Sequence, residues 1–403
     1  MSDICVYDFI IIGGGFAGLY FCYKLKKLNQ NIKFLLLEKN ISIGGRALQK
    51  KFYGSNVSLG AGVGRKDTNP LLQNLCKELN EPISESKAII DYAFDNYCDI
   101  VEVLNYLKKE YSKNPEKYKC MIFKNFCIEI LGIEKYKTFK ISNGYTDYEK
   151  ADVYETLYHY GIEDNKSGWD KLYLNWESLI NKLVENINHH NIKLSQEVID
   201  LEKKSNIFKV STTNSQYYYS KNIVIATTLK PLQKLLNFPL YKQIHSQIFL
   251  RVYAKLNKNI VSNYTVVDSP LQKIIPINPK NNIYMIAYTD NENSIIINKI
   301  LNNCNKIKLL EELLEKSLNL QNIKILDMIH FWWDEGTHYY SPLCSHFNSR
   351  EEFIKKAQHP KKNIFVIGEV VSRLQGWVEG ALQSVENIFQ INYFFLDNHK
   401  LNL

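Results

Sequence analysis

Apolar and polar positions follow two different periods along this chain, and together they predict a mixed α/β protein. The apolar run from Phe9 to Ile12 is short, as in a buried strand, and it ends at a cluster of glycines. Apolar residues then recur at helical spacing as far as Leu25, and a second apolar run at 33–37 predicts another strand. The order strand, turn, helix, strand is typical of a parallel sheet covered by helices.

The same patterns predict the elements farther along. Residues 87–111 carry apolar side chains three and four positions apart, which predicts one long amphipathic helix. Residues 112–190 are predicted to be mostly helical, with glycines as breaks. The other predicted elements are a hairpin at 208–219, strands at 222–227, 246–255 and 284–288, and an amphipathic helix at 306–319.

The first turn has a spacing that points to a nucleotide. Gly13, Gly15 and Gly18 fit G-x-G-x-x-G between a strand and a helix: the first permits the sharp turn, the second lets a pyrophosphate approach the backbone, and the third allows close helix packing. The helix N-terminus would offer free N–H groups to the phosphates. Glu38 ends the next strand twenty residues after Gly18, where a carboxylate accepts hydrogen bonds from a ribose diol.

Composition and charge exclude several classes of protein. A chain of 403 residues is too long for one simple core, so two domains are expected, and 45% hydrophobic with 23% charged residues argues against disorder. The net charge of +8 is spread without a basic arm, which gives no support to nucleic-acid binding.

Cysteine usage and hydropathy bear on the compartment. Eight irregularly spaced cysteines without a C-x-x-C pair favour reduced thiols in an intracellular protein over a disulfide framework or a zinc site, and no metal site is expected. The first strand begins too early to leave room for a signal peptide, and no apolar run reaches roughly 18 residues, so no membrane span is expected. We expect a cytoplasmic protein.

A second glycine element follows Glu38. Gly44 and Gly45 allow close backbone approach, and Arg46 supplies a fixed cation for a pyrophosphate. With the opening stretch, this element resembles the flavin-dependent amine oxidases, which include monoamine, polyamine and L-amino-acid oxidases. The resemblance implies FAD as cofactor and a Rossmann-like FAD-binding domain with an interleaved α+β substrate domain. The implied FAD domain is 1–80, 190–243 and 342–403, and the implied substrate domain is 81–189 and 244–341.

The resemblance also implies where FAD is contacted. The glycine-rich segment 59–65 would lie against the flavin ring, the backbone of Val198 would meet the adenine, and Glu369 would lie at the ribityl and phosphate part. The start of a helix at Trp377 and Val378 would face the pyrimidine end of the ring. The full set of implied cofactor residues is Gly13, Gly15, Phe16, Ala17, Gly18, Glu38, Lys39, Gly45, Arg46, Gly62, Val63, Gly64, Arg65, Val198, Gly368, Glu369, Trp377 and Val378.

The sequence leaves open the roles of two basic residues, Arg65 and Lys273. Arg65 would favour a substrate carboxylate or the cofactor, but a solvated or phosphate-facing arginine is an equal alternative. Gln247 stands where many family members carry a lysine bridged through water to flavin N5, and glutamine holds a water without providing a base. Lys273, in an apolar setting, could reach in from a neighbouring strand to replace that lysine, or its amine could extend to the surface.

The resemblance places an aromatic cage around the substrate. Trp377 would form one wall, and His338 and Tyr339 fall where the other wall lies, with the register open by one residue. Thr337 stands where monoamine oxidases have a cysteine bonded to FAD, so the cofactor is expected to be non-covalent.

Three functions are compatible with these residues. The first is oxidation of an amine C–N bond by hydride transfer to flavin N5, with imine hydrolysis and reoxidation by dioxygen to hydrogen peroxide. The second is an L-amino-acid oxidase in which Arg65 or Arg251 clamps a carboxylate. The third is a FAD-bound binding protein without turnover, which Gln247 keeps open. The sequence specifies neither the substrate nor the oligomeric state.

Overall fold

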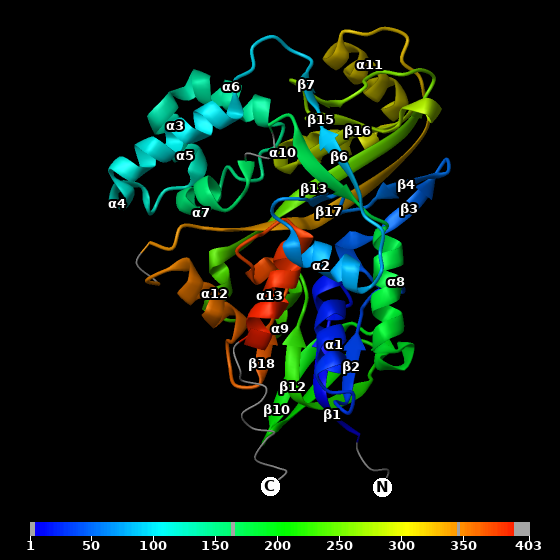
Figure 1. Ribbon diagram of the computed structural model, residues 1–403, viewed down its shortest axis with the longest axis vertical. Helices are drawn as coiled ribbons and strands as arrows, with labels where there is room; N and C mark the ends of the chain where they lie inside the picture. The colour runs from blue at the N-terminus through cyan, green and yellow to red at the C-terminus, as the bar shows by residue number, and fades with distance from the viewer. Residues whose placement is uncertain (1–4, 163–165, 345–346, 391–403) are drawn as a thin grey trace.

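The computed structural model describes residues 5–162, 166–344 and 347–390. Two large sheets lie one above the other in Figure 1, with helices around the lower sheet and a helical lobe beside the upper one. The N-terminal strand and the last described helix both belong to the lower part, so the two ends of the chain build the same unit.

The lower sheet is built around the first strand. Ile10 of β1 pairs with Leu35 of β2 on one side and with Ile223 of β12 on the other, and both pairings are parallel. Strands β11 and β12 form the predicted antiparallel hairpin, with Ser211 opposite Tyr217. The strand order is β10 (Val198–Lys204), β11 (Ile207–Thr212), β12 (Tyr217–Ile225), β1 (Val6–Ile12), β2 (Phe34–Leu37) and β9 (Ile192–Lys193), with β18 (Ile364–Val366) also paired to β12.

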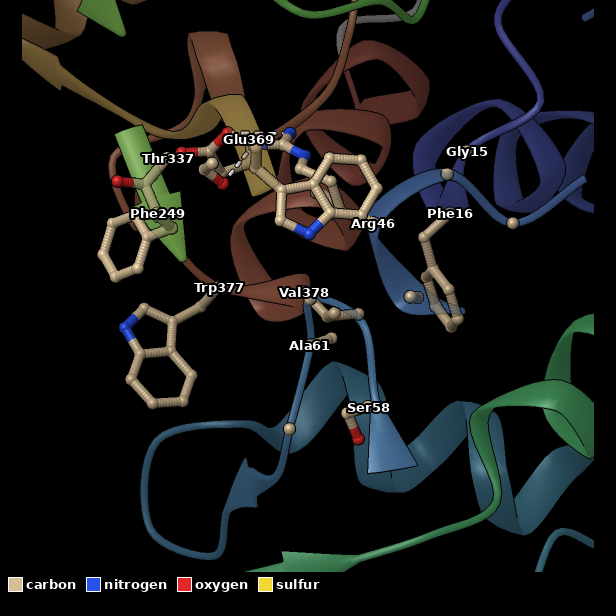
Figure 2. Close-up of a pocket in the computed structure, with 18 of the residues that line it drawn as sticks. Gly15, Phe16, Arg46, Ser58, Ala61, Phe249, Thr337, Glu369, Trp377 and Val378 are labelled. Carbon is tan, nitrogen blue, oxygen red and sulfur yellow. Dashed lines mark hydrogen bonds and ion pairs between the residues drawn. The ribbon is translucent and has the colours of Figure 1, made fainter. Parts of the chain in front are cut away.

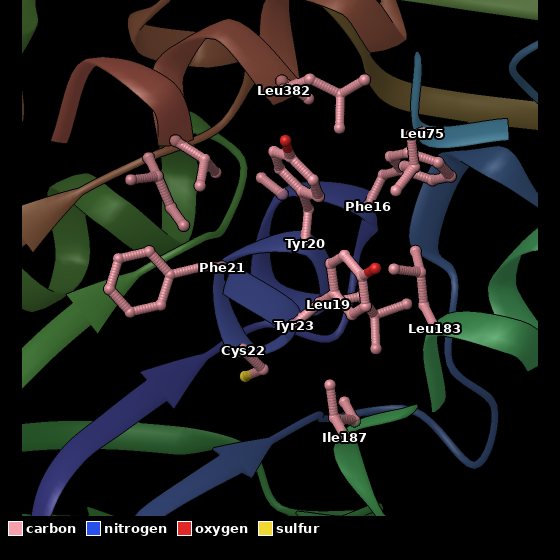
Figure 3. Close-up of a cluster of buried hydrophobic side chains, with 14 of the residues drawn as sticks. Phe16, Leu19, Tyr20, Phe21, Cys22, Tyr23, Leu75, Leu183, Ile187 and Leu382 are labelled. Atoms are coloured by element: carbon pink, nitrogen blue, oxygen red, sulfur yellow. The ribbon is translucent and has the colours of Figure 1, made fainter. Parts of the chain in front are cut away.

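Alternation along β1 sends side chains to two separate cores. Phe9 and Ile11 join the cluster of Figure 3, while Ile10 and Ile12 join the cluster on the opposite face. In Figure 3 the helix that follows the glycine turn fills the centre, with Leu19, Tyr20 and Tyr23 between the neighbouring helices. The first face is covered by α1 (Phe16–Leu28), α2 (Pro70–Glu78), α8 (Trp176–Ile187) and α13 (Val378–Gln390), and the second by α9 (Leu229–Leu236) and α12 (Arg350–Gln358).

The upper sheet contains the two longest strands, β13 and β17, which pair along nearly their whole length. Its outer face packs against α10 (Asn291–Leu301) and α11 (Lys306–Leu318), and α11 was predicted from the sequence. The strand order is β17 (Ile325–Tyr340), β13 (Ile244–Leu256), β16 (Ile283–Asp290), β15 (Lys273–Asn278), β14 (Tyr264–Val266) and β7 (Ile90–Tyr92).

The prediction of a single helix at 87–111 was wrong. Residues 84–88 and 90–92 are strands, and the helix begins only at Ile100, where the Asp99 carboxylate accepts hydrogen bonds from the N–H groups of Val101 and Glu102. Ile90 pairs with Tyr264, far along the chain, so this strand depends on a partner that local periodicity does not reveal.

The helical lobe and two small sheets complete the fold. The lobe has its own apolar cluster and contains α3 (Ile100–Lys113), α4 (Pro115–Tyr118), α5 (Phe123–Leu131), α6 (Ile133–Asn143) and α7 (Val153–Tyr158). The small sheets are β3 (Gln49–Phe52) with β4 (Ser55–Ser58), and β5 (Gly64–Arg65), β8 (Trp169–Tyr173) and β6 (Ser84–Ala88). Among the described helices, none combines the length and apolar character needed to cross a bilayer.

Candidate functional site

A cavity of about 1390 Å³ lies between the two sheets. It extends from the glycine turn after β1, past the start of α13, to side chains of the upper sheet (Figure 2). Pockets for drug-sized ligands usually have about 300–1,000 Å³. The cavity is therefore large enough for one ligand bigger than a drug-sized molecule, or for two ligands bound next to each other.

Three glycines of the first turn have different physical roles. A Cβ on Gly13, where φ is +110°, would lie 2.5 Å from the carbonyl oxygen of Ala226, and one on Gly18 would lie 2.1 Å from the oxygen of Gly13. A Cβ on Gly15 would meet no atom within 4 Å. Gly15 is the N-cap of α1 and has no side chain to cap that end, so the free amides of α1 begin at open cavity. The start of α1 therefore has the geometry that suits an anion, and a side chain at position 15 would occupy that space.

Glu38 is fixed at the cavity edge by the backbone around it. Its Oε2 accepts a hydrogen bond of 2.7 Å from the N–H of Gly14, and its Oε1 accepts bonds from the N–H and side-chain amide of Asn40 at 2.9 and 2.8 Å. The carboxylate is buried and ties the end of β2 to the glycine turn. The ribose contact expected for this residue stays a prediction.

A buried carboxylate joins three distant segments at the middle of the cavity. Glu369 Oε2 lies 3.0 Å from Arg46 Nη2 and 2.6 Å from His338 Nδ1, and its Oε1 accepts hydrogen bonds from the N–H groups of His338 and Gly376. Burial raises the pKa of Glu369, but the charges of His338 and Arg46 and these donors outweigh it and hold the pKa well below its usual range. Arg46 also donates to the carbonyl of Gly336 at 2.8 Å.

Trp377 lies at the cavity where α13 begins. The guanidinium of Arg65 lies 3.4 Å from the centre of the indole ring. Arg65 is itself buried. The side chain of Glu379 accepts hydrogen bonds from the N–H groups of Leu71 and Leu72, which fixes the start of α2 against α13. Figure 2 shows Trp377 and Phe249 on the same side of the cavity, below Thr337.

The structure brings most of the predicted cofactor residues to this one cavity. Three of them do not line it: Gly18 and Gly64 pack behind the wall, and Arg65 stacks on Trp377. Those that line it are Gly13, Gly15, Phe16, Ala17, Glu38, Lys39, Gly45, Arg46, Gly62, Val63, Val198, Gly368, Glu369, Trp377 and Val378.

Of the residues predicted at the reacting atoms, only Trp377 lines the cavity. The amide of Gln247 is turned away: its nitrogen donates to the carbonyl of Asp147, and its oxygen accepts a bond of 2.9 Å from Asn291. The His338 ring is held by Glu369, and the Tyr339 ring stacks on His245 at 5.1 Å. The second aromatic wall is therefore not supplied by 338 or 339.

Lys273 is buried behind the cavity wall. Its amine lies 3.6 Å from the centre of the Tyr145 ring, and Tyr145 lines the cavity while Lys273 does not. Burial lowers the pKa of Lys273 to about 7, and the negative charges of Asp290 and Asp147 oppose that shift. From its apolar neighbours, Lys273 was predicted to reach the cofactor directly. In the structure its amine lies behind Tyr145 and does not line the cavity.

Sequence reasoning named Arg251 as a possible carboxylate clamp but missed the aromatic residues around it at the upper end. Phe249 and Tyr253, at alternate positions of β13, line the cavity with Arg251 between them, and Trp333 enters from β17. Gln247 is opposite Thr337 and Phe249 is opposite Trp333, so residues 334–336 bulge opposite one residue of β13. Alternation along the strand was the available signal for 249, 251 and 253.

Comparisons with known proteins agree with this architecture. Residues 11–79 match a family model described as an NAD(P)-binding Rossmann-like domain. The structure of a putrescine oxidase double mutant, from a structure-based redesign of cofactor binding, superposes with a TM-score of 0.77 at 11% identity, over 96% of this chain and 99% of that one. This chain has the putrescine oxidase fold. The predicted fold class, a Rossmann-like domain with an interleaved α+β domain, is confirmed.

Proposed function

We propose that the protein binds FAD non-covalently and oxidises a C–N bond of an amine. The observation that carries this is one continuous cavity that joins the open cradle at Gly15 to an aromatic chamber beneath the upper sheet. The fold shared with a putrescine oxidase supports the proposal. Our division into an FAD domain of 1–80, 190–243 and 342–403 and a substrate domain of 81–189 and 244–341 belongs to the same proposal.

The residues present fit the dinucleotide. The cradle at Gly15 and the start of α1 suit a diphosphate, and Glu38 suits a ribose diol and disfavours a 2′-phosphate. Thr337 Oγ1 is buried at the cavity wall and hydrogen-bonds to no residue that the structure describes, so a polar ligand atom would satisfy it. Threonine has no thiolate, which supports non-covalent binding.

The chain's own residues would prepare the substrate rather than react with it. When bound, FAD supplies the hydride acceptor and the route of electrons to dioxygen. Trp377, Phe249 and Trp333 give the chamber apolar walls, which disfavour an ammonium ion and favour the reactive neutral amine. The start of α13 directs positive helix-dipole potential into the cavity, where it stabilises negative charge. The imine formed by oxidation of the amine would hydrolyse in water, and dioxygen would be reduced to hydrogen peroxide.

The proposal is tested by the colour of the protein. We expect the purified protein to be yellow and the flavin band near ~450 nm to disappear when a suitable amine is added without oxygen, because substrate then reduces the cofactor. Admission of air should restore the band and release hydrogen peroxide. A colourless protein that FAD does not restore contradicts cofactor binding. A yellow protein that no amine or amino acid bleaches supports a flavin-bound binding protein instead.

Lys273→Met separates a direct role of Lys273 from a structural one. General acid–base catalysis contributes about 10²- to 10⁴-fold, so loss of a group at the reacting atoms would slow bleaching by at least about 100-fold. Since Lys273 lies behind Tyr145, we expect the rate constant of bleaching to change by less than about tenfold. Stopped-flow absorbance measures it, and a drop of two orders of magnitude with an unchanged flavin spectrum would restore the catalytic assignment.

A further inference from the structure

Two exposed cysteines from distant parts of the chain lie together where the helical lobe meets the lower part of the molecule. Cys120 lies between α4 and α5 of the lobe, and Cys344 follows β17 on the way to α12. Both are free thiols on the surface. Their side chains hydrogen-bond to each other, although they are more than 200 positions apart in the sequence. The fold therefore brings two accessible sulfur atoms into contact.

The backbone on both sides is held by one residue, Asp152, which caps the start of α7. Ile122, two residues after Cys120, pairs with Asp152 in an antiparallel bridge. The N–H of Asp152 donates to the carbonyl of Tyr340 at 2.9 Å, and its carboxylate accepts a hydrogen bond from the N–H of Leu343. The segments that carry the two thiols are thus fixed to the same point.

Ion pairs attach the lobe to the lower part around that point. Arg350 at the start of α12 is 4% exposed, lies 3.4 Å from Asp152 Oδ2 and donates to the carbonyl of Ser341 at 2.9 Å. Arg373 lies 3.2 Å from Glu155 Oε1 on α7. Since these contacts are buried or half-buried, the two cysteines face each other at a packed junction, and a bond between them would not need the two parts to move together.

The charges near the two sulfur atoms give the thiols different roles. The Lys119 cation interacts with both cysteines and favours their thiolates. Partial burial of Cys344, followed by its hydrogen bond with Cys120, raises the pKa of Cys344 to about 11. Cys344 therefore stays protonated at neutral pH, and Cys120 supplies the thiolate. Among the residues that the structure describes, no group of three or more histidines, cysteines or acids could hold a metal.

We propose that hydrogen peroxide converts Cys120 and Cys344 into a reversible disulfide that ties the helical lobe to the segment before α12. The Cys120 thiolate attacks the peroxide: an S–O bond forms, the O–O bond breaks, and the leaving hydroxide takes up a proton to become water. The sulfur of Cys344 then attacks the sulfenic sulfur: an S–S bond forms, the S–O bond breaks, and hydroxide leaves with the Cys344 proton as a second water. Two thiols lose two electrons, and one peroxide becomes two waters.

This site is independent of the cavity between the sheets. The proposed oxidase reaction would release hydrogen peroxide next to it, but peroxide from any source would serve. Glutathione and thioredoxin keep thiols reduced inside cells, so the bond would form only while peroxide accumulates and would then be reversed. Because the test adds peroxide without an amine, its failure leaves the proposed function untouched.

Peptide mapping tests the proposal. The full chain is reduced, freed of reductant, treated with a small excess of hydrogen peroxide in the presence of a chelator, blocked with an alkylating agent and digested without reductant. We expect a linked peptide pair that contains Cys120 and Cys344, the loss of two free thiols per chain, and full recovery of both with dithiothreitol. The yield should not change on about tenfold dilution of the protein, since the bond forms within one chain. Both thiols still free after Cys304 is oxidised would overturn the proposal.

Variants identify the two partners. Cys120→Ser and Cys344→Ser should each abolish the linked peptide, and in Cys344→Ser a 1,3-diketone probe should trap the sulfenic acid on Cys120. Cys304→Ser is the matched control, because it removes an exposed cysteine whose sulfur hydrogen-bonds to Asn303, and it should leave the linked peptide unchanged. Oxidation of Cys120 to a sulfinic acid in the wild type, with Cys344 still free, would contradict a disulfide between them.

Thermal unfolding shows whether the bond fits the native structure. A link between such distant positions restrains mainly the unfolded chain, so peroxide should raise the unfolding midpoint of the wild type by about 2–5 °C at a fixed excess of FAD. The midpoint of Cys120→Ser should stay unchanged under the same treatment. A linked protein with a lower midpoint would show that the bond distorts the fold, and this would overturn the proposal.

Discussion

A Gly15→Leu variant is expected to fold normally and to purify without flavin. The backbone of Gly15 has φ −76°, which any residue adopts, and an added Cβ would meet no atom within 4 Å. The leucine side chain would instead fill the cradle at the start of α1. If it displaces two charge-assisted hydrogen bonds worth about 1.5–3 kcal/mol each, the affinity for FAD falls by at least about 100-fold.

Two glycine controls make this result specific. Gly15→Ala adds one methyl group to the same space and should weaken FAD binding less than leucine. In Gly18→Val, the Cβ would lie 2.1 Å from the Gly13 oxygen, so that variant should lose folded protein rather than only colour. The ratio of flavin to protein absorbance and the thermal unfolding of flavin-free samples separate the two effects. A yellow Gly15→Leu protein would exclude this turn as the phosphate site.

The lower sheet and its glycine turn were predictable because their signals are local. The strand of 9–12 becomes the buried part of β1, and the turn and α1 follow within the same short stretch of sequence. Gly13 and Gly18 are fixed by contacts within the turn or with the adjacent strand, so their spacing alone specifies the geometry.

The strand at 90–92 was not predictable in the same way. Its apolar residues share helical spacing with those of the real helix, α3, which starts only after the Asp99 cap. What makes Ile90 a strand residue is its pairing with Tyr264 in β14, more than 170 positions away. Single-sequence periodicity carries no information about such a partner.

The upper end of the cavity was predicted least well because side-chain direction there depends on a bulge. Residues 334–336 bulge opposite one residue of β13, and Glu335 is carried toward the start of α9. The His338 side chain then points to Glu369 instead of the chamber. Trp377, which the family resemblance placed beside a helix start, does line the cavity, between Gly376 and the first residue of α13.

The buried carboxylate at Glu369 is expected to stabilise the fold strongly. Replacement by the isosteric glutamine in Glu369→Gln removes the charge that faces Arg46 and the His338 ring while keeping the side-chain shape. Breaking a buried ion pair costs about 3–5 kcal/mol, and since Arg46 is partly exposed we expect about 3 kcal/mol in the free energy of unfolding. Urea unfolding with FAD at one fixed excess measures the difference, because flavin binding itself adds stability.

The dependence of that difference on pH identifies its cause. The folded-state pKa of Glu369 lies below its unfolded value of about 4.3, so the stabilisation is complete above that value and is lost as the pH falls toward the folded-state pKa. The gap between wild type and Glu369→Gln should therefore be constant from about pH 6 to 8 and narrow below about pH 4. As a control, Glu352→Gln removes the half-exposed carboxylate that pairs with the exposed Lys356 on α12, and it should change stability little. Equal urea midpoints for Glu369→Gln and wild type at pH 7 would show that this carboxylate does not hold the three segments together.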